Sequence, residues 1–318
     1  MNKPNETGIS ICRWTRSRWR GGRNCYKSIY GVDSHRCLQM TPVPNFCTFS
    51  CIFCWRAFGK NRFKAKKNRG DAKSLVDEMI EKQRRLISGF GGSKYTSREM
   101  WGEAMKPAHF AISMDGEPTL YPYLAELIKE IKSRGMTAFL VSNGTMPDKL
   151  RKLLEKKAIP DNLSISVYAT NAEDYEKVTN PFIKNPFEKV IESLKLMRRF
   201  KNARTNFRMT LVKDLNLKDA EGYAKLIKIG KPKFITIKGY SFIGASQKRL
   251  KKENMPSMPE LENFAEQIEE YTGYKIKIKD KISTAIILIK DEKVWKWNEK
   301  KIEEQKIRFS RANLSGCT

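Results

Sequence analysis

Residues 109–131 read HFAISMDGEPTLYPYLAELIKEI and contain one complete strand–loop–helix unit. The first six of these residues are mostly apolar and have the length of a buried strand, which the polar stretch Asp115–Pro118 ends. Pro122 suits the first turn of a helix, and apolar residues recur at helical spacing from Leu124 to Ile131. The stretch therefore predicts a buried strand followed by a helix that packs on it.

The same alternation continues along the chain. Further strands are predicted at residues 35–41, 138–141, 163–167, 207–212 and 234–240. Further helices are predicted at residues 72–87, from Pro147 onward, and at residues 171–178, 185–200 and 217–228. About six such units predict an α/β fold with a parallel sheet, and a partial TIM-like (β/α)6 barrel fits better than a doubly wound sheet. In either fold ligands bind at the carboxyl ends of the strands, where Glu117, Asn143 and Tyr168 fall.

Extensions flank this barrel on both sides. The predicted parts are an N-terminal extension, the barrel and a C-terminal extension, at residues 1–36, 37–250 and 251–318. In the last part we expect a helix at residues 259–271 and a hairpin whose strands are residues 274–278 and 284–289. The last twenty residues are polar and charged, and we expect them to be loose.

Three cysteines lie close together in the stretch CTFSCIFC, at Cys47, Cys51 and Cys54. A loop this short can direct three thiolates at an iron–sulfur cluster of four irons, which leaves one iron open for catalysis. Structural zinc and disulfides remain alternatives. Zinc sites usually have four protein ligands, however, and the next histidine after this loop is His109.

A second group of cysteines precedes this loop, at Cys12, Cys25 and Cys37, with twelve and eleven residues between neighbours. Isolated cysteines are commonly small buried hydrophobic residues, but three at near-equal spacing are also compatible with a second three-thiolate cluster. Lys27 follows Cys25 by two residues and would lie near such a cluster. A lysine shielded from water can lose its proton and form a Schiff base, whereas by default it is a solvated charge.

The charge balance points to a polyanionic partner. The chain has 62 Lys and Arg residues against 35 Asp and Glu residues, a net charge of +27, which favours nucleic acid. Thermophile-like lysine enrichment usually brings matching glutamate, which is not seen here.

Two basic segments contain aromatic residues, an arrangement that suits phosphate contact and base stacking. In the first, arginines including Arg16 and Arg18 surround Trp14 and Trp19. The second runs from Lys60 to Arg69 and includes Lys64, Lys66 and Lys67. The alternative is that these charges are solvated surface and that the tryptophans pack on the domain.

Several classes of protein are disfavoured. The sequence has no run of 18 apolar residues and a polar N-terminus, so we expect no membrane span and no secretory signal. Seven cysteines without such a signal indicate a reducing cytoplasm, where cysteines are more often metal ligands than disulfides. We expect a cytoplasmic monomer.

Several separate stretches, in order, resemble the radical S-adenosylmethionine (SAM) 4-demethylwyosine synthases of tRNA, in their single-domain archaeal form. The resemblance covers roughly residues 12–270. The stretches that carry it are Cys25–Lys27, Tyr30–Pro42, Cys51–Arg56, Gly116–Pro122, Ser142–Thr145, Lys238–Tyr240 and Asn254–Pro256.

The resemblance implies a radical-SAM type of partial barrel and assigns roles to the residues at its mouth. Cys47, Cys51 and Cys54 would hold a [4Fe–4S] cluster whose open iron binds SAM, and one electron would cleave SAM to a 5′-deoxyadenosyl radical. Glu117 would accept a hydrogen bond from the SAM amino group, and Asn143 would lie near the ribose. Gly116 and Tyr168 would complete the cofactor site.

The resemblance also implies the substrates. Hydrogen would be abstracted from the N-methyl group of 1-methylguanosine beside the anticodon of phenylalanine tRNA, and pyruvate would supply two carbons of the new ring. Cys12, Cys25 and Cys37 would hold a second [4Fe–4S] cluster, and Lys27 would form a Schiff base with pyruvate. The basic residues would grip the tRNA, those expected to take part being Arg16, Arg18, Lys64, Lys66 and Lys67.

Some points stay open at this level. The eukaryotic members carry a flavodoxin-like domain for which this chain has no room, so an external electron donor is expected. One alternative is a radical-SAM enzyme with another substrate, which would have no reason for Lys27 or for the basic surplus. The other is a non-catalytic, zinc-bearing RNA-binding protein, which would not explain polar residues collected at the strand ends.

Overall fold

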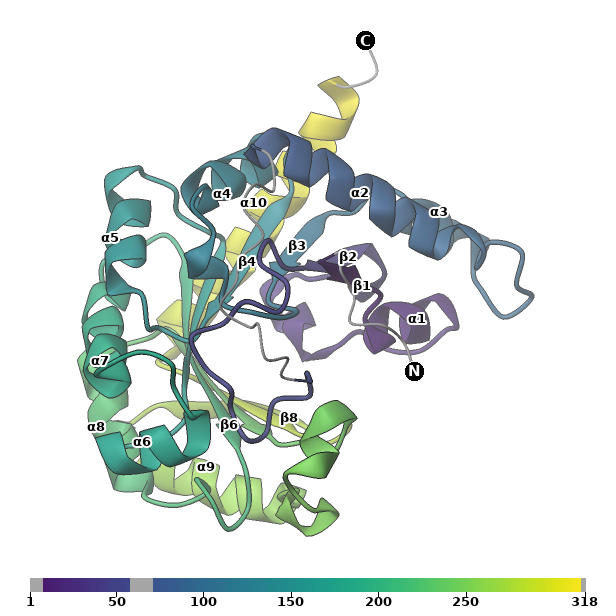
Figure 1. Ribbon diagram of the computed structural model, residues 1–318. Coiled ribbons are helices and arrows are strands. Elements are labelled where there is room, and N and C mark those ends of the chain that lie inside the picture. The colour runs from purple at the N-terminus through teal and green to yellow at the C-terminus, as the bar shows by residue number, and fades with distance from the viewer. Residues whose placement is uncertain (1–7, 58–70, 316–318) are drawn as a thin grey trace.

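The structure is a computed structural model that describes residues 8–57 and 71–315. Its centre is a nine-stranded sheet in which six neighbouring strands run parallel and curve into an open barrel (Figure 1). The parallel strands are β2 (Cys37–Met40), β3 (His109–Ile112), β4 (Thr137–Ser142), β5 (Asn162–Val167), β6 (Arg204–Leu211) and β7 (Phe234–Gly239). Each pairs with the next one along the chain, which confirms the predicted partial (β/α)6 barrel.

Antiparallel strands extend the sheet at both edges. The short strand β1 (Ile9–Ser10) pairs with β2. At the other edge β8 (Lys275–Asp280) and β9 (Ala285–Ile289) form the predicted hairpin. The hairpin joins the barrel through β9, which pairs antiparallel with β7 along its whole length.

Helices cover the outer face of the sheet (Figure 1). They are α2 (Ala72–Ser88), α4 (Leu124–Ser133), α5 (Pro147–Glu155), α7 (Pro186–Met197), α8 (Ala220–Gly230) and α9 (Met258–Thr272), with the shorter α6 (Ala172–Thr179) beside α7. Local signals set their ends. Asp71 caps α2 by accepting from the backbone N–H of Ser74 at 2.8 Å, and α9 begins with a reciprocal capping box between Ser257 and Glu260. Pro122 lies two residues before the first helical residue of α4, so it precedes that helix instead of forming its first turn.

The N-terminal segment fills the inside of the barrel. Its short 3₁₀ helix η1 (Tyr26–Tyr30) places Tyr30 against Phe139 of β4 and Phe234 of β7, at ring-centroid distances of 5.9 and 5.1 Å. These rings belong to an apolar cluster separate from the larger core between sheet and helices. A second 3₁₀ helix, η2 (Ser34–Arg36), then leads directly into β2.

The segment before η1 also folds against the barrel. It contains α1 (Arg13–Trp19), which the sequence analysis did not predict. Trp19 is buried and packs on Phe90 at 5.3 Å, near α3 (Arg98–Ala104). Trp19 is therefore a core residue, and the expectation that it stacks on bases is wrong.

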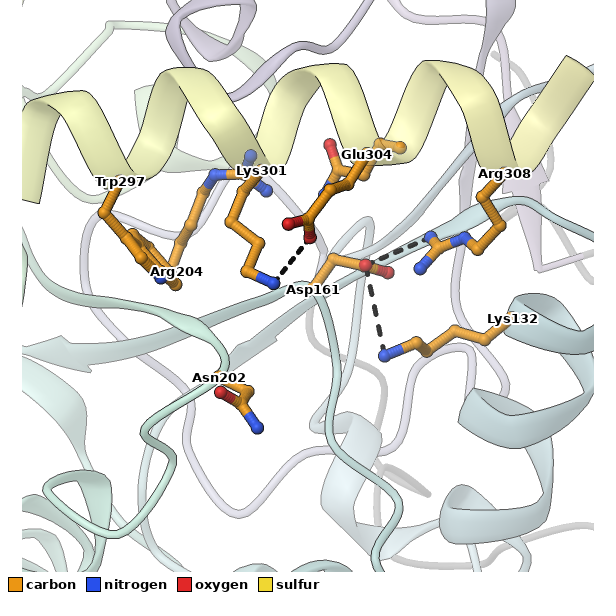
Figure 2. Close-up of a pocket in the computed structure, with 9 residues that line it drawn as sticks. Lys132, Asp161, Asn202, Arg204, Trp297, Lys301, Glu304 and Arg308 are labelled. Carbon is orange, nitrogen blue, oxygen red and sulfur yellow. Dashed lines mark hydrogen bonds and ion pairs between the residues drawn. The ribbon is translucent and has the colours of Figure 1, made fainter.

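The expectation of a loose C-terminal end is also wrong. Residues 292–315 form one long helix, α10 (Glu292–Ser315), which crosses behind the sheet at the amino ends of the strands (Figures 1 and 2). Buried polar residues anchor it. Asn298 accepts from Arg204 Nε at 2.5 Å and donates to the carbonyl of Ile29 at 2.8 Å, so α10 joins the start of β6 to the N-terminal segment.

A cavity of about 220 Å³ remains between α10 and the strand ends, and its lining is charged. Figure 2 shows three ion pairs that cross or border this space: Asp161 with Arg308 at 3.0 Å, Asp161 with Lys132 at 4.0 Å, and Glu304 with Lys301 at 2.6 Å. Asp161 also accepts the backbone N–H of Ala138 at 2.9 Å. One carboxylate thus ties α10 to the amino ends of β4 and β5.

We expect Asp161→Ala to destabilise the protein by about 3 kcal/mol, because it would leave the buried N–H of Ala138 without an acceptor and would remove the carboxylate that faces two partly buried cations, Arg308 and Lys132. The free energy of unfolding, measured in urea by circular dichroism, checks this. Asp148→Ala is the control, since Asp148 is 78% exposed and also pairs with an arginine, Arg151. Equal losses in the two variants would contradict a special role for Asp161.

Candidate active site

A second cavity, of about 160 Å³, opens at the carboxyl ends of the parallel strands. Its walls come from the loop after β2 and from the residues that end β3, β4 and β5. Seven residues singled out in the sequence line it: Cys47, Cys51, Cys54, Gly116, Glu117, Asn143 and Tyr168. The structure therefore brings together residues that are up to about 120 positions apart.

The thiol loop is fixed by hydrogen bonds from other parts of the chain. The backbone N–H of Ile52 donates to the carbonyl of Val178 at 3.0 Å, and Arg249 Nε donates to the carbonyl of Ile52 at 3.0 Å. Arg249 also donates to the carbonyl of Cys54. These bonds come from α6 and from the segment after β7, so both sides of the barrel hold the loop in place.

None of the six cysteines in the described ranges 8–57 and 71–315 forms a disulfide, and these six include the three of this loop. Within those ranges no three Cys, His, Asp or Glu side chains converge closely enough to bind one metal ion. The thiolates of a [4Fe–4S] cluster each bind a different iron, so they need to surround a volume and not a point. Three thiols on the wall of one cavity fit that requirement.

Gly116 occupies a position that excludes other residues. Its φ is +69°, and a Cβ there would lie 2.2 Å from the carbonyl oxygen of Val43 and 2.5 Å from that of Phe46. The neighbouring N–H of Glu117 donates to the carbonyl of Phe46 at 2.8 Å. The close approach lets the loop after β3 lie flat against the segment that leads into the thiol loop.

Glu117 is almost fully buried at the end of β3. One carboxylate oxygen accepts from Thr119 N, Thr119 Oγ1 and Ser142 Oγ at 3.0, 2.6 and 2.8 Å. The other accepts from Asn143 N at 2.6 Å. Burial raises the pKa of Glu117 above its usual range, although these hydrogen bonds oppose that change. Glu117 lines the cavity, and its second oxygen accepts one of the hydrogen bonds described here, so it has capacity for another donor.

Asn143 connects the end of β4 with the thiol loop. Its Nδ2 donates to Thr48 Oγ1 at 2.8 Å and lies 3.7 Å from Cys47 Sγ. Its Oδ1 accepts from the N–H and the hydroxyl of Thr145, at 3.1 and 2.7 Å. The side chain is therefore occupied in positioning Cys47, which is a structural role that its sequence position did not reveal.

Tyr168, just beyond β5, forms the aromatic wall of the cavity. Its ring lies 5.0 Å from Phe53 and 6.4 Å from Phe49, both of the thiol loop. Burial raises the pKa of its hydroxyl, and the nearby Cys51 adds to this effect. The ring presents a neutral, flat surface beside the thiols.

The second group of thiols also comes together, inside the barrel. Cys12 and Cys25 directly precede α1 and η1, and Cys37 begins β2. Burial raises the pKa of Cys37 to about 12; Lys27 opposes this change, and Cys12 and Cys25 add to it. The three thiols and the amine of Lys27 therefore lie within electrostatic range of one another.

Lys27 points into the lumen, with Nζ 4.8 Å from the centre of the Phe139 ring. Burial of its ammonium lowers the pKa, but the negative charge available on Tyr26 and the three cysteines outweighs it, and the pKa of Lys27 is raised. Shielding from water alone would favour the neutral amine of Lys27, but the thiols around it favour the protonated form. Thiolates that bind a metal share their charge with it, which weakens this effect.

The lumen contains two further cations that the sequence analysis did not single out. Arg208 of β6 lines the cavity at the strand ends. Lys238 of β7 donates to the carbonyl of Ser283 at 2.6 Å, and burial, followed by the charges of Arg208 and Arg13, lowers its pKa to about 8. For Lys238 the available signal was a charged residue in the mostly apolar strand β7, whereas β6 contains several polar residues and Arg208 does not stand out in it.

The predicted nucleic-acid residues are only partly covered by the described ranges. Arg16 is exposed on α1. Arg18 is partly buried, and its Nη1 donates to the carbonyl of Gly22 at 3.1 Å, so it helps to hold the end of α1. Lys64, Lys66 and Lys67 lie outside the described residues.

No helix among the described residues is both long enough and apolar enough to cross a membrane.

Comparison with known proteins identifies the class to which this barrel and its thiol loop belong. The profile of the Radical SAM superfamily matches residues 41–227, more than half of the chain, so the chain is a member of that superfamily. Its members use SAM together with a [4Fe–4S] cluster. A second profile, described as wyosine base formation, matches residues 229–291.

Within this superfamily the chain belongs to the S-adenosyl-L-methionine-dependent tRNA 4-demethylwyosine synthases. It is 39% identical to the synthase of Pyrococcus horikoshii over 290 residues, which covers 90% of this chain and 84% of the relative. The synthase of Methanocaldococcus jannaschii is 34% identical, with 90% of this chain and 91% of the relative covered.

A solved structure described as TYW1 with a lysine-pyruvate adduct bound has the same fold. Its TM-score is 0.80 at 32% identity, with 89% of this chain and 90% of that chain covered. The identity and coverage confirm the family and the α/β radical-SAM barrel that the sequence resemblance implied.

Proposed function

We propose that this protein forms the tricyclic 4-demethylwyosine base from 1-methylguanosine beside the anticodon of phenylalanine tRNA, with pyruvate as the two-carbon donor. The observation that carries the proposal is the position of Lys27. Its amine lies among Cys12, Cys25 and Cys37, inside the barrel whose mouth holds the other three thiols. A radical-SAM enzyme that acts on another substrate would have no reason for Lys27 or for the basic surplus.

Cys47, Cys51 and Cys54 would hold the catalytic cluster, which supplies the electron that cleaves SAM. Glu117 has a free acceptor position on the cavity side and would receive the SAM amino group there. Gly116 supports this placement, because its missing side chain lets the loop that bears Glu117 approach the thiol loop. Asn143 would act mainly by holding Cys47, and Tyr168 would offer its ring to the adenosyl group.

Pyruvate would bind in the cationic lumen. The neutral amine of Lys27 would attack the carbonyl carbon, the resulting carbinolamine would lose water, and the Schiff base so formed would hold pyruvate, two of whose three carbons enter the new ring. Arg208 and Lys238 would supply positive charge for the carboxylate of pyruvate. Among the residues that line the described cavity, the only carboxylates are those of Asp115 and Glu117. Cys12, Cys25 and Cys37 would hold the second cluster beside this unit. The relative with a lysine-pyruvate adduct supports the assignment of Lys27.

A tRNA substrate is consistent with the net charge of +27, because phosphate contacts dominate the affinity for nucleic acids. Arg16, on the exposed side of α1, would contribute, and Lys64, Lys66 and Lys67 stay predictions. Arg18 is a weaker candidate because its guanidinium is engaged with Gly22. We infer a monomer that works in the cytoplasm with an external electron donor.

The direct test is a set of omission reactions with anaerobically reconstituted protein. We expect the tricyclic base to form, and carbon from labelled pyruvate to enter the tRNA, only when SAM, a reductant, pyruvate and 1-methylguanosine-containing tRNA are all present. The same tRNA without the methyl group is the matched control and is expected to remain unlabelled. Cleavage of SAM without incorporation of label into methylated tRNA would point to another substrate, and a protein that binds zinc and no iron would exclude the reaction.

A further inference from the structure

Two residues that follow the last cluster cysteine have no role in the proposed function. Trp55 lines the mouth of the cavity, and 42% of it is exposed, although it is among the largest apolar side chains of the protein. The guanidinium carbon of Arg56 lies 3.9 Å from the centre of its ring. The two side chains thus form a stacked pair, with a flat indole open to solvent at the entrance to the site.

The Arg56 guanidinium lacks the hydrogen-bond partners that its burial demands. Only 13% of the side chain is exposed, and Nε and Nη2 are buried with no acceptor among the described residues. The nearest carboxylate oxygen, Asp115 Oδ2, is 3.8 Å from Nε, which is too far for a hydrogen bond. Buried N–H groups without a partner are costly, so the arrangement favours an acceptor that comes from a ligand.

The backbone of the pair is held rigidly. The carbonyl of Trp55 accepts from Ala245 N at 2.8 Å, in the 3₁₀ helix η4 (Gly244–Lys248). Gly244 has φ of +59°, and a Cβ there would lie 2.4 Å from the same carbonyl oxygen. The segment after β7 can press this closely on Trp55 only because residue 244 is glycine. A platform fixed in this way loses little conformational freedom when a ligand binds.

We propose that Trp55 and Arg56 form a subsite for one nucleotide of an unpaired RNA loop, in which the indole stacks on the base and the guanidinium donates to a phosphate oxygen. The inference rests on the proposed function, since it assigns part of the tRNA contact. Aromatic rings stack on any base, and the planar guanidinium matches a phosphate with two parallel N–H groups. The open indole and the unpartnered N–H groups lie side by side, as base and phosphate do in one nucleotide.

The test measures binding of a fluorescently labelled RNA stem–loop with 1-methylguanosine in its loop, by anisotropy at several salt concentrations. The holoprotein is compared with Trp55→Leu, which keeps bulk but no ring, and with Trp55→Phe. We expect Trp55→Leu to weaken binding by about tenfold or more with the salt dependence unchanged, and Trp55→Phe to retain most of the affinity. Arg56→Gln is expected to weaken binding and to reduce the slope of log K against log salt by about one.

Tyr95→Leu is the matched control, because Tyr95 is 67% exposed and also has a cation near its ring, Lys94 at 5.1 Å, but does not line the cavity. We expect it to bind RNA like the wild type. The iron content of the Trp55 and Arg56 variants is expected to equal that of the wild type, which shows that the cluster site is intact, and SAM binding is measured in the same variants by anaerobic equilibrium dialysis.

The possible results separate the two levels of inference. If wild-type holoprotein does not bind the stem–loop, the proposed function and this subsite both fail. If wild type binds and Trp55→Leu binds equally well, the subsite alone is overturned. Loss of SAM binding in Arg56→Gln with full RNA affinity would assign the guanidinium to the carboxylate of SAM instead.

Discussion

Lys27→Ala is expected to abolish formation of the tricyclic base while SAM cleavage continues. The substitution removes the amine that would hold pyruvate, but Lys27 belongs to the inner group of residues around η1 and not to the cavity that contains Cys47, Cys51 and Cys54. We expect product formation to fall by about a thousandfold or more, the scale seen when a group used in covalent catalysis is removed. The measurement is product in modified tRNA beside 5′-deoxyadenosine in the same reaction.

Borohydride trapping gives an independent readout of the same prediction. Wild-type protein incubated with pyruvate and reductant should gain a covalent adduct that peptide mass spectrometry places on Lys27. Lys27→Arg, which keeps the charge, should gain none at this position, and Lys94→Ala, at an exposed lysine outside the barrel, should trap pyruvate normally. An adduct on Lys238 in place of Lys27 would move the Schiff base to the other lumen lysine.

The triple variant Cys12→Ala/Cys25→Ala/Cys37→Ala is expected to lose half of the iron. Anaerobically reconstituted wild type should contain about eight irons per chain and the triple variant about four, because each [4Fe–4S] cluster contributes four. The thiols are neighbours of Lys27, so the variant should also fail to form product while it still binds SAM. Metal analysis by mass spectrometry, with electron paramagnetic resonance of the reduced protein, makes the measurement.

Two controls accompany the iron count. Cys317→Ala removes the seventh cysteine of the chain, which belongs to neither group of three and lies outside the described residues, and should leave about eight irons in place. Cys47→Ala/Cys51→Ala/Cys54→Ala should keep about four irons but lose SAM cleavage. If the wild type and the Cys12/Cys25/Cys37 variant contain equal iron, these three cysteines have only a packing role, and the proposed second cluster beside Lys27 is excluded.

The strand–helix alternation was predictable because the barrel is built from local patterns. Each buried parallel strand is a short apolar run, and each helix shows its inward face at helical spacing, as Leu124, Leu127, Ile128 and Ile131 do in α4. The convergence of Cys54, Glu117 and Asn143 at one cavity follows from the same topology, since all lie just beyond the ends of parallel strands or in the loop above them.

Helix α10 could not be recognised in the same way. Its inward face includes Trp295, Asn298, Ile302, Gln305 and Phe309, which recur at intervals of three and four. Asn298 and Gln305 are buried, but they are polar because they face Arg204 and the charged lining at the amino ends of the strands. The expected apolar periodicity is therefore interrupted, and only the tertiary partners reveal why the helix forms.

Contacts inside the site were equally out of reach of the sequence. Three such contacts depend on side-chain geometry: Asn143 holds Cys47, Arg18 bonds to the carbonyl of Gly22 beyond α1, and Arg56 has two N–H groups without an acceptor among the described residues. Lys238 offered a weak signal as a charge within the mostly apolar strand β7, and Arg208 offered none within the polar strand β6. The importance of both residues becomes clear only from their positions in the lumen.

The way α10 crosses the base of the barrel has a consequence for how the chain folds during synthesis. Asn298 joins the carbonyl of Ile29 to Arg204, and Arg308 reaches the carbonyl of Met136, so the helix that is made after every strand connects parts of the chain made long before. Until α10 leaves the ribosome, Arg204 and Asp161 lack these partners and the amino ends of the strands stay open to water. Ordering of the barrel base is then a late step of folding, with contacts of large sequence separation, and it would follow formation of the thiol loop at the opposite end.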